Sequence, residues 1–223
     1  MAKTIVVIPA MNEEQHIKDV VAKARKYVKT VLVVDDGSVD ETAKVAKRAG
    51  AEVISLPKNM GKGFALRIGA IEAMNKGADI IVFMDGDGQH RPEDIKPFAD
   101  SVKRGHDLVF GRRKAGRMPV VKRVGNWGIR LIFRLLFGKY PGDLLCGFKA
   151  MKAEILPNIM WKKQDYSVEI EIAVRAAHQK FNVGYVDIPT IYHDPGKGTT
   201  VMDGLKMGLE MLRLKWMILR ERM

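Results

Sequence analysis

Short apolar runs alternate with amphipathic segments along the first half of the chain. The runs predict strands, and they lie at residues 5–8, 31–34, 53–56 and 79–84. Between them apolar residues recur at helical spacing, which predicts helices over residues 13–27, 40–49 and 63–76. Strands that alternate with helices of this length indicate βαβ units, so we expect an α/β fold with a mostly parallel sheet flanked by helices.

The second half of the chain is less regular. It predicts strands over residues 107–110 and 183–188, a helix over residues 168–179 and a loop over residues 143–147. We expect one domain over residues 1–195, which includes a basic segment at residues 112–139. An amphipathic C-terminal helix over residues 196–223 follows it.

A pair of carboxylates follows the most apolar of these strands. Residues 80–84 are all apolar and lead into Asp85-Gly86-Asp87-Gly88-Gln89. In an extended segment residues i and i+2 point to the same side, so both carboxylates can face one ligand, and Gly86 lets the backbone approach it. Hard oxygen ligands at a strand end suit Mg²⁺ or Mn²⁺ carrying a diphosphate. A polar turn that binds nothing is the alternative.

Polar residues also follow the other predicted strands. Pro9, Asn12 and Glu13 come after the first strand, Asp36 after the second, and Lys62 lies between two glycines near a helix start. The carboxyl ends of parallel strands meet at one edge, so these residues should converge on one ligand. A carboxylate accepts hydrogen bonds from a ribose or a base, and a helix start favours phosphate. A helix cap at Asp36 and a solvated Lys62 are the structural alternatives.

Composition and motifs narrow the class of protein. The 223 residues are 47% hydrophobic and 29% charged, as in folded domains, and the net charge of +12 predicts an anionic partner. No basic helix-turn-helix or RNA-binding signature accompanies the charge, so we expect no nucleic acid. No G-x-G-x-x-G motif follows the first strand, which argues against a dinucleotide-binding dehydrogenase. The sequence also lacks the G-x-x-x-x-G-K-[ST] motif of a phosphate-binding loop. Cys146 is the single cysteine, which excludes an intrachain disulfide and suits a reducing compartment; we expect it to be packed and not nucleophilic.

Targeting and membrane-spanning patterns are also absent from the sequence. Pro9 interrupts the first apolar run, so we predict no signal peptide, and no window offers 18 uncharged apolar residues. We therefore expect a protein that is soluble or lies on a membrane surface.

The motifs together resemble those of the inverting family 2 glycosyltransferases, and within them the dolichyl-phosphate mannose synthase and polyprenyl-phosphate glycosyltransferase group. The resemblance spans roughly residues 4–190. It rests on VVIPAMNEE, VVDDGSVDET, NMGKGFALRIGA, FMDGDGQH, GRR and DLLCGFKAMK. It implies a nucleotide-diphospho-sugar transferase fold of the GT-A type, a nucleotide-sugar donor and a divalent metal.

The resemblance also implies roles for individual residues. Pro9, Asn12 and Glu13 would line the nucleotide site, and Asp36 would contact base or ribose. Asp85, Asp87 and Gln89 would hold the metal and diphosphate, Arg113 would face the phosphates, and Glu171 would line the sugar pocket. We expect Asp87 and Arg113 to be the catalytic residues, and His90 to be a loop histidine without a catalytic role.

One loop departs from the pattern of the mannose synthases. Those enzymes place an arginine and a lysine after the late strand, whereas here Pro195 stands about where the arginine would be and Lys197 is the nearby cation. We assign Lys197 to the nucleotide-sugar site. GDP-mannose, UDP-N-acetylglucosamine and UDP-glucose all remain possible donors.

The basic segment predicts a membrane partner. Residues 112–139 hold nine lysines and arginines and no carboxylate, interleaved with large apolar residues that include Ile129, Phe133 and Leu136. The C-terminal helix repeats the pattern, with Leu209, Leu212 and Trp216 at helical spacing. Such helices lie in an anionic membrane interface. Ordinary amphipathic helices packed on the core are the alternative.

We therefore expect a peripheral enzyme on the cytoplasmic face of a membrane. It would move one sugar from a nucleotide donor to dolichyl or another polyprenyl phosphate. A transferase of the same fold with a soluble or polysaccharide acceptor is the first alternative, and a non-catalytic nucleotide-sugar-binding protein is the second. The sequence leaves the oligomeric state open.

Overall fold

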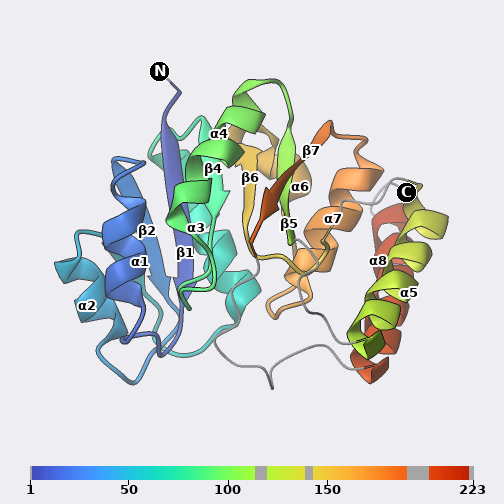
Figure 1. Cartoon of the computed structure of the whole chain (residues 1–223), viewed down its shortest axis with the longest axis horizontal. Helices are drawn as coiled ribbons and strands as arrows, with labels where there is room; N and C mark the ends of the chain where they lie inside the picture. The colour runs from blue at the N-terminus through green and yellow to red at the C-terminus, as the bar shows by residue number, and fades with distance from the viewer. Residues whose placement is uncertain (1, 114–119, 139–142, 190–200, 221–223) are drawn as a thin grey trace.

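One twisted sheet runs through the molecule. The computed structural model describes residues 2–113, 120–138, 143–189 and 201–220, and within these ranges seven strands pair in the order β3-β2-β1-β4-β6-β5-β7 (Figure 1). The strands are β1 Thr4–Ala10, β2 Thr30–Asp35, β3 Glu52–Ser55, β4 Ile80–Phe83, β5 Leu108–Arg113, β6 Lys149–Lys152 and β7 Val183–Ile188. Strand β6 runs antiparallel to both β4 and β5, and the other pairs are parallel, which confirms the expected mostly parallel sheet.

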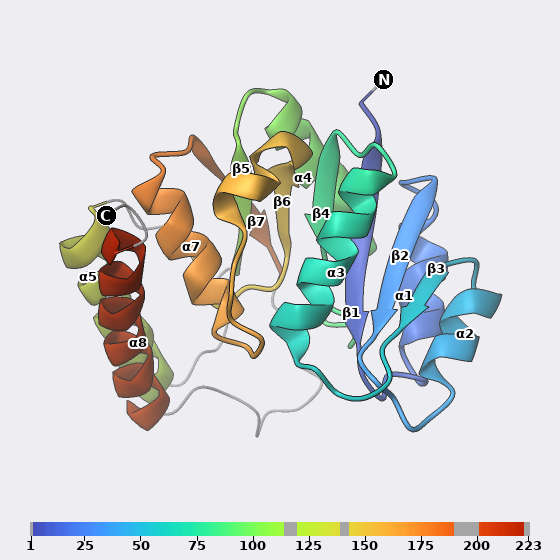
Figure 2. The same cartoon turned by 180° about the vertical axis from the view of Figure 1, so that it is seen from behind.

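Helices cover both faces of the sheet. They are α1 Ile17–Ala24, α2 Thr42–Arg48, α3 Lys62–Asn75, α4 Ile95–Lys103, α5 Val120–Phe137, α6 Leu156–Ile159, α7 Val168–His178 and α8 Val201–Arg220. Helices α1, α2 and α4 lie on one face, and α3, α6 and α7 lie on the other (Figures 1 and 2). Helices α5 and α8 lie side by side next to α7.

The central strands show why the sheet needs two helical layers. Ile5 and Val7 of β1 belong to the core cluster that includes residues of α3 and α7, whereas Val6 and Ile8 belong to the cluster that includes residues of α1 and α4. All four side chains are fully buried. Successive side chains of a strand point to opposite faces, so an uninterrupted apolar run must be covered on both sides.

Three of these helices and strands were not predicted: α4, α6 and β6. The four residues of β6 include Lys149 and Lys152, so they form no apolar run, and the stretch reads as part of a loop. The other predicted elements are present, with ends that differ by a few residues; for example, α1 covers residues 17–24 of the expected 13–27. A strand that pairs on both sides acquires its conformation from its neighbours, which sequence periodicity does not report.

The basic segment is partly a core element. Ile129 and Phe133 of α5 are buried, together with Met211, Leu214 and Ile218 of α8, in the same cluster as the sheet residues. The expectation that the apolar residues of this segment face lipid is therefore wrong for Ile129 and Phe133. The expected domain boundary at residue 195 falls outside the described residues.

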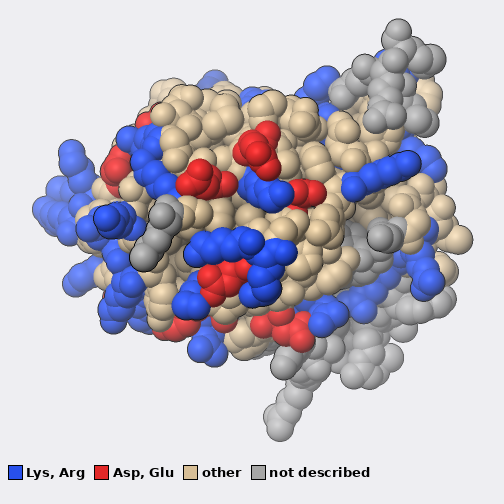
Figure 3. Space-filling model, turned by 90° about the horizontal axis from the view of Figure 1, so that it is seen from above, with Lys and Arg blue, Asp and Glu red and all other residues tan. Residues whose placement is uncertain are grey.

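The lengths of the helices and the distribution of surface charge bear on the predicted contact with a membrane. In the described ranges no helix is both long and apolar enough to cross a bilayer. The face seen from above shows lysine and arginine side chains interspersed with acidic ones, and not one continuous basic patch (Figure 3). On this face, membrane contact would therefore depend on a more local arrangement of cations and apolar side chains.

The packing of α5 predicts different effects for two of its apolar residues. Phe133→Ala removes a fully buried ring and should lower the free energy of unfolding by about 3–5 kcal/mol. Leu135→Ala, at a side chain that is 76% exposed, should change it by less than about 0.5 kcal/mol. Urea denaturation of both variants measures the difference, and equal effects would contradict the placement of α5.

Candidate active site

A cavity of about 360 Å³ opens at the carboxyl ends of the parallel strands. It lies where the strand order reverses, because β1 has β2 on one side and β4 on the other. Ligands of open α/β sheets bind at such a switch point. The cavity is lined by Pro9, Ala10, Met11, Glu13, Asp36, Asn59, Gly61, Lys62, Asp85, Gly86, Asp87, Asp165 and Tyr166.

Most of the predicted site residues meet in this cavity. Those that line it are Pro9, Glu13, Asp36, Lys62, Asp85, Gly86 and Asp87. Asn12, Gln89, Arg113 and Glu171 are not among its lining residues, and Lys197 falls outside the described residues. Asp165 and Tyr166, from the loop before α7, were not predicted to line it.

Asp36 holds the loop that forms one wall of the cavity. Its Oδ1 accepts a hydrogen bond from Met60 N at 2.7 Å, and its Oδ2 accepts one from Gly61 N at 2.9 Å. Gly61 has a φ of 93°, and a side chain there would overlap Gln164 O. The buried carboxylate thus positions the 59–61 loop, and its expected contact with base or ribose stays a prediction.

Asn12 ties the first two strand ends together. Its backbone adopts a left-handed φ of 56°, its N donates to Ser38 Oγ at 2.9 Å, and its Oδ1 accepts from Val39 N at 3.0 Å. The neighbouring Glu13 N donates to Thr42 Oγ1 at 2.7 Å. Asn12 therefore supports the wall that Pro9 and Glu13 line.

Asp85 enters the cavity beside a cation. Its Oδ1 lies 2.7 Å from Lys62 Nζ. Burial alone would raise the pKa of Asp85, but Lys62 and the neighbouring cations outweigh burial and hold the pKa well below its usual range. A Cβ at Gly147 would overlap the Asp85 carboxylate, so the loop before β6 needs glycine at this position.

Two hydrogen bonds within residues 85–90 stabilise the loop after β4. Asp85 N donates to His90 Nδ1 at 3.1 Å, and Gln89 N donates to Asp87 Oδ1 at 2.9 Å. The His90 ring packs on Phe148, and burial lowers the pKa of His90, so the imidazole accepts this bond in its neutral form. His90 thus positions the backbone of the carboxylate pair.

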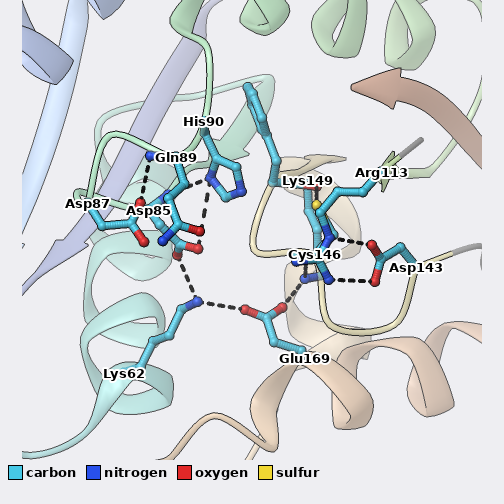
Figure 4. A network of polar contacts seen from close by, with 11 residues as sticks. Lys62, Asp85, Asp87, Gln89, His90, Arg113, Asp143, Cys146, Lys149 and Glu169 are labelled. Carbon is cyan, nitrogen blue, oxygen red and sulfur yellow. Dashed lines mark hydrogen bonds and ion pairs between the residues drawn. The ribbon is translucent and has the colours of Figure 1, made fainter. Parts of the chain in front are cut away.

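Arg113 ends β5 and pairs with a residue that was not predicted. Its Nε lies 2.5 Å from Asp143 Oδ2, and its Nη2 lies 3.0 Å from Asp143 Oδ1. A bidentate pair of this kind fixes the plane of the guanidinium. Figure 4 shows both residues on the side of the site near Cys146 and Lys149.

Two buried residues connect α7 with the site. Lys149 of β6 and Glu169 of α7 form an ion pair, and Glu169 Oε1 lies 3.1 Å from Lys62 Nζ (Figure 4). The Lys149 side chain is 1% exposed; burial lowers its pKa, and the carboxylates of Asp85 and Asp143 oppose this shift. Neither residue was predicted.

Glu171 does not face the cavity. It is completely buried and accepts hydrogen bonds from Lys162 N and from Lys163 N, the latter at 2.8 Å. Its Oε1 lies 2.8 Å from Arg175 Nε. These contacts hold the segment before the Asp165 loop, so the structure gives Glu171 a supporting position and brings Glu169 to the site instead.

Cys146 is a packed thiol, as expected. It is buried, and burial raises its pKa to about 11, so the neutral form dominates near neutral pH. A side chain on Gly111 would come against its sulfur.

Comparison with known proteins agrees with this geometry. Residues 5–160 match the family described as glycosyl transferase family 2. The chain belongs to glycosyl transferase family 2. It is therefore a glycosyltransferase, and the expected enzyme class and nucleotide-sugar transferase fold are confirmed.

Relatives of this family 2 glycosyltransferase cover nearly its whole length. The UDP-N-acetylglucosamine–dolichyl-phosphate N-acetylglucosaminyltransferase of Methanococcus voltae is 34% identical, over 94% of this chain and 94% of the relative. The polyprenol monophosphomannose synthase of Mycolicibacterium smegmatis is 29% identical, over 91% of this chain and 82% of the relative. The resemblance to the polyprenyl-phosphate group is thus confirmed.

A solved structure of the same fold is that of glucosyl-3-phosphoglycerate synthase from Mycobacterium tuberculosis. Its TM-score is 0.74 at 24% identity, and the match covers 96% of this chain and 79% of that one. At this identity the likeness supports the fold and nothing finer.

The position of Glu171 predicts a loss of stability. Glu171→Gln removes the charge opposite buried Arg175 and should lower the free energy of unfolding by about 3 kcal/mol, measured in urea. Glu93→Gln, which breaks a pair of exposed side chains with Arg91, is the matched control and should cost less than about 0.5 kcal/mol. Equal effects of the two substitutions would mean that Glu171 has no supporting role.

Proposed function

We propose that this glycosyltransferase moves a sugar from a nucleotide-sugar donor to a polyprenyl phosphate, as a peripheral enzyme on the cytoplasmic face of a membrane. The observation that carries the proposal is the meeting of Asp85, Asp87 and Lys62 in one cavity at the switch point. Relatives that match almost the whole chain are named for transfer to dolichyl phosphate or synthesis of polyprenol monophosphomannose.

The chemistry requires little acid–base catalysis. A phosphate oxygen of the acceptor would form a bond to C1 of the sugar, and the bond from C1 to the nucleoside diphosphate would break with inversion. The acceptor oxygen is already an anion near neutral pH, so the site needs no strong general base. Positioning and electrostatic stabilisation then supply most of the catalysis.

Cations in and beside the cavity suit a diphosphate leaving group. Lys62 is the first residue of α3, where the helix dipole also favours an anion. Arg113, fixed by Asp143, would present its guanidinium from the end of β5. We assign Lys62 to the donor diphosphate and Arg113 to the phosphates of donor or acceptor.

The donor set fits a divalent metal. Asp85, Asp87 and Gln89 offer oxygen atoms on one short loop, which suits Mg²⁺ or Mn²⁺. In the described part of the chain no three His, Cys, Asp or Glu side chains group as metal ligands, so the amide of Gln89 and groups of the substrate would complete the set. When bound, the metal would supply positive charge to the leaving diphosphate.

A stripe of exposed side chains on α5 and α8 supports a lipid surface. We call it the interface stripe; it consists of Arg130, Leu131, Arg134, Leu135, Leu209, Leu212, Arg213, Trp216 and Arg220. The Arg220 guanidinium lies 3.6 Å from the centre of the Trp216 ring. Arginine next to Leu and Trp is the composition of helices that lie in an anionic membrane interface.

Transfer of a radiolabelled sugar to lipid tests the proposed reaction. GDP-mannose, UDP-N-acetylglucosamine and UDP-glucose should be screened with Mg²⁺ or Mn²⁺ against polyprenyl phosphate, and one donor should yield a labelled lipid. Asp87→Asn should lower the rate at least about tenfold, or ~1.4 kcal/mol in barrier, while its circular dichroism spectrum stays unchanged. Label appearing only in soluble or polysaccharide acceptors would favour the soluble-acceptor alternative. No transfer from any of the three donors to any acceptor would contradict the proposed reaction.

Vesicle binding tests the interface stripe. Changing Leu209, Leu212 and Trp216 to Ser should reduce co-sedimentation with anionic vesicles at least about fivefold, because exposed apolar area is lost. Binding of the unchanged protein should weaken as salt rises. Val39→Ser, at an exposed apolar residue outside the stripe, is the control. If the triple variant binds as well as the control, the stripe does not contact lipid.

A further inference from the structure

Four side chains of alternating charge form a connected series that ends in the cavity, at Lys62 and Asp85. Lys149 contacts Glu169, Glu169 contacts Lys62, and Lys62 contacts Asp85 (Figure 4). They come from β6, α7, the first residue of α3 and the loop after β4. The fold therefore brings together four charges that are far apart in the sequence.

The series is largely buried, and its formal charges cancel. The side chains of Lys149 and Glu169 are 1% and 4% exposed, and those of Lys62 and Asp85 are 14% and 24% exposed. Buried charges persist only when they are paired, so the two lysines and the two carboxylates depend on one another. Any added charge at Asp85 must therefore change the partners of Lys62.

Lys62 occupies a pivotal place in this series, because it bridges the two carboxylates. Its Nζ is 2.7 Å from Asp85 Oδ1 and 3.1 Å from Glu169 Oε1. Glu169 is in turn held by Lys149, which lies on a central strand and also donates to Cys146 O. Glu169 can thus keep Lys62 in the cavity when Lys62 leaves Asp85.

We propose that Lys62 is a built-in competitor of the divalent cation for Asp85. The inference rests on the proposed function, which gives Asp85 a cation and the cavity a nucleotide diphosphate. An ammonium in contact with Asp85 opposes the approach of a second cation to the same carboxylate. Lys62 pivots about Glu169 from Asp85 towards the diphosphate, so each ligand removes an obstacle to the other.

This arrangement couples the two ligands. The cation binds weakly to the free enzyme, because it must displace Lys62 from Asp85. It binds more tightly when a diphosphate is present to accept Lys62. Linkage requires the diphosphate to bind more tightly in the presence of the cation by the same factor. Lys62 thereby disfavours binding of the metal ion in the absence of the diphosphate.

Direct measurement of Mn²⁺ binding tests the proposal without an activity assay. Free Mn²⁺ is titrated by electron paramagnetic resonance against the full chain, alone and with UDP or GDP. Lys62→Gln should bind Mn²⁺ at least about fivefold more tightly than the unchanged protein in the absence of nucleotide. Its gain in Mn²⁺ affinity on adding the nucleoside diphosphate should be at least about fivefold smaller.

Two further variants separate contact from charge. Lys62→Arg keeps a cation beside Asp85 and should stay within about twofold of the unchanged protein. Lys58→Gln makes the same change in charge next to Asn59 at the rim of the cavity, and should also stay within about twofold. Thermal unfolding followed by circular dichroism verifies that each variant is folded.

Several outcomes would overturn the competition. The first is that Lys62→Gln does not tighten Mn²⁺ binding, the second is that Lys58→Gln tightens it equally, and the third is that no variant binds Mn²⁺ under any condition. If the first outcome accompanies sugar transfer to polyprenyl phosphate, this inference fails and the proposed function stands. If Mn²⁺ binding follows the expected pattern but no lipid is glycosylated, the acceptor assignment fails and the competition stands.

Discussion

The parallel pairing of β1 with β4 determines where the site can form. Val7 lies opposite Phe83 in the register, and both strands are buried on both faces. Polar side chains can therefore appear only where these strands end, and both end at the same edge of the sheet. Met84 N still donates to Val7 O at 3.1 Å, so the ladder extends almost to the carboxylate pair. The rigid strands thus fix the position of Asp85, while the loops after β1 and β2 supply the walls of the cavity.

Burial of charge is the second constraint, and it joins the two halves of the molecule. Lys149 lies on the antiparallel strand β6 and Glu169 on α7. Each of these buried charges would be strongly destabilising without the other. Their contact with Lys62 links the late elements of the chain to the first βαβ units. Late elements of the chain therefore support the cavity, although most of its lining residues come from the first 90 positions. Because Lys149 and Glu169 are buried structural residues that contact Lys62, the proposed binding of cation and diphosphate depends on the same contacts that stabilise the fold.

Helices α5 and α8 serve two environments at once. Their inner faces, with Phe133 and Met211, belong to the core, and their outer faces form the interface stripe. This division makes the two interpretations of the basic segment compatible, because a packed helix can also present cations and apolar side chains outwards. Membrane contact would then place the enzyme near a lipid phosphate without a spanning helix in the described part of the chain.

The sequence alone predicted the sheet, most of its strands and the residues at the ends of β1, β2 and β4, because uninterrupted apolar runs are a local signal and parallel strands share one carboxyl edge. It missed β6, whose lysines break the apolar pattern, and it chose Glu171 over Glu169. On α7 every residue from Val168 to Ala176 is buried, so no polar face marks the side that meets the site. Residues two apart on a helix point to nearly opposite sides, and only the packing of α7 decided which carboxylate reaches Lys62. The pairing of Arg113 with Asp143 and of Lys149 with Glu169 likewise joins residues whose proximity no local pattern encodes. Local apolar periodicity thus determined the framework and the strand-end carboxylates, and tertiary packing alone decided which buried charges surround them.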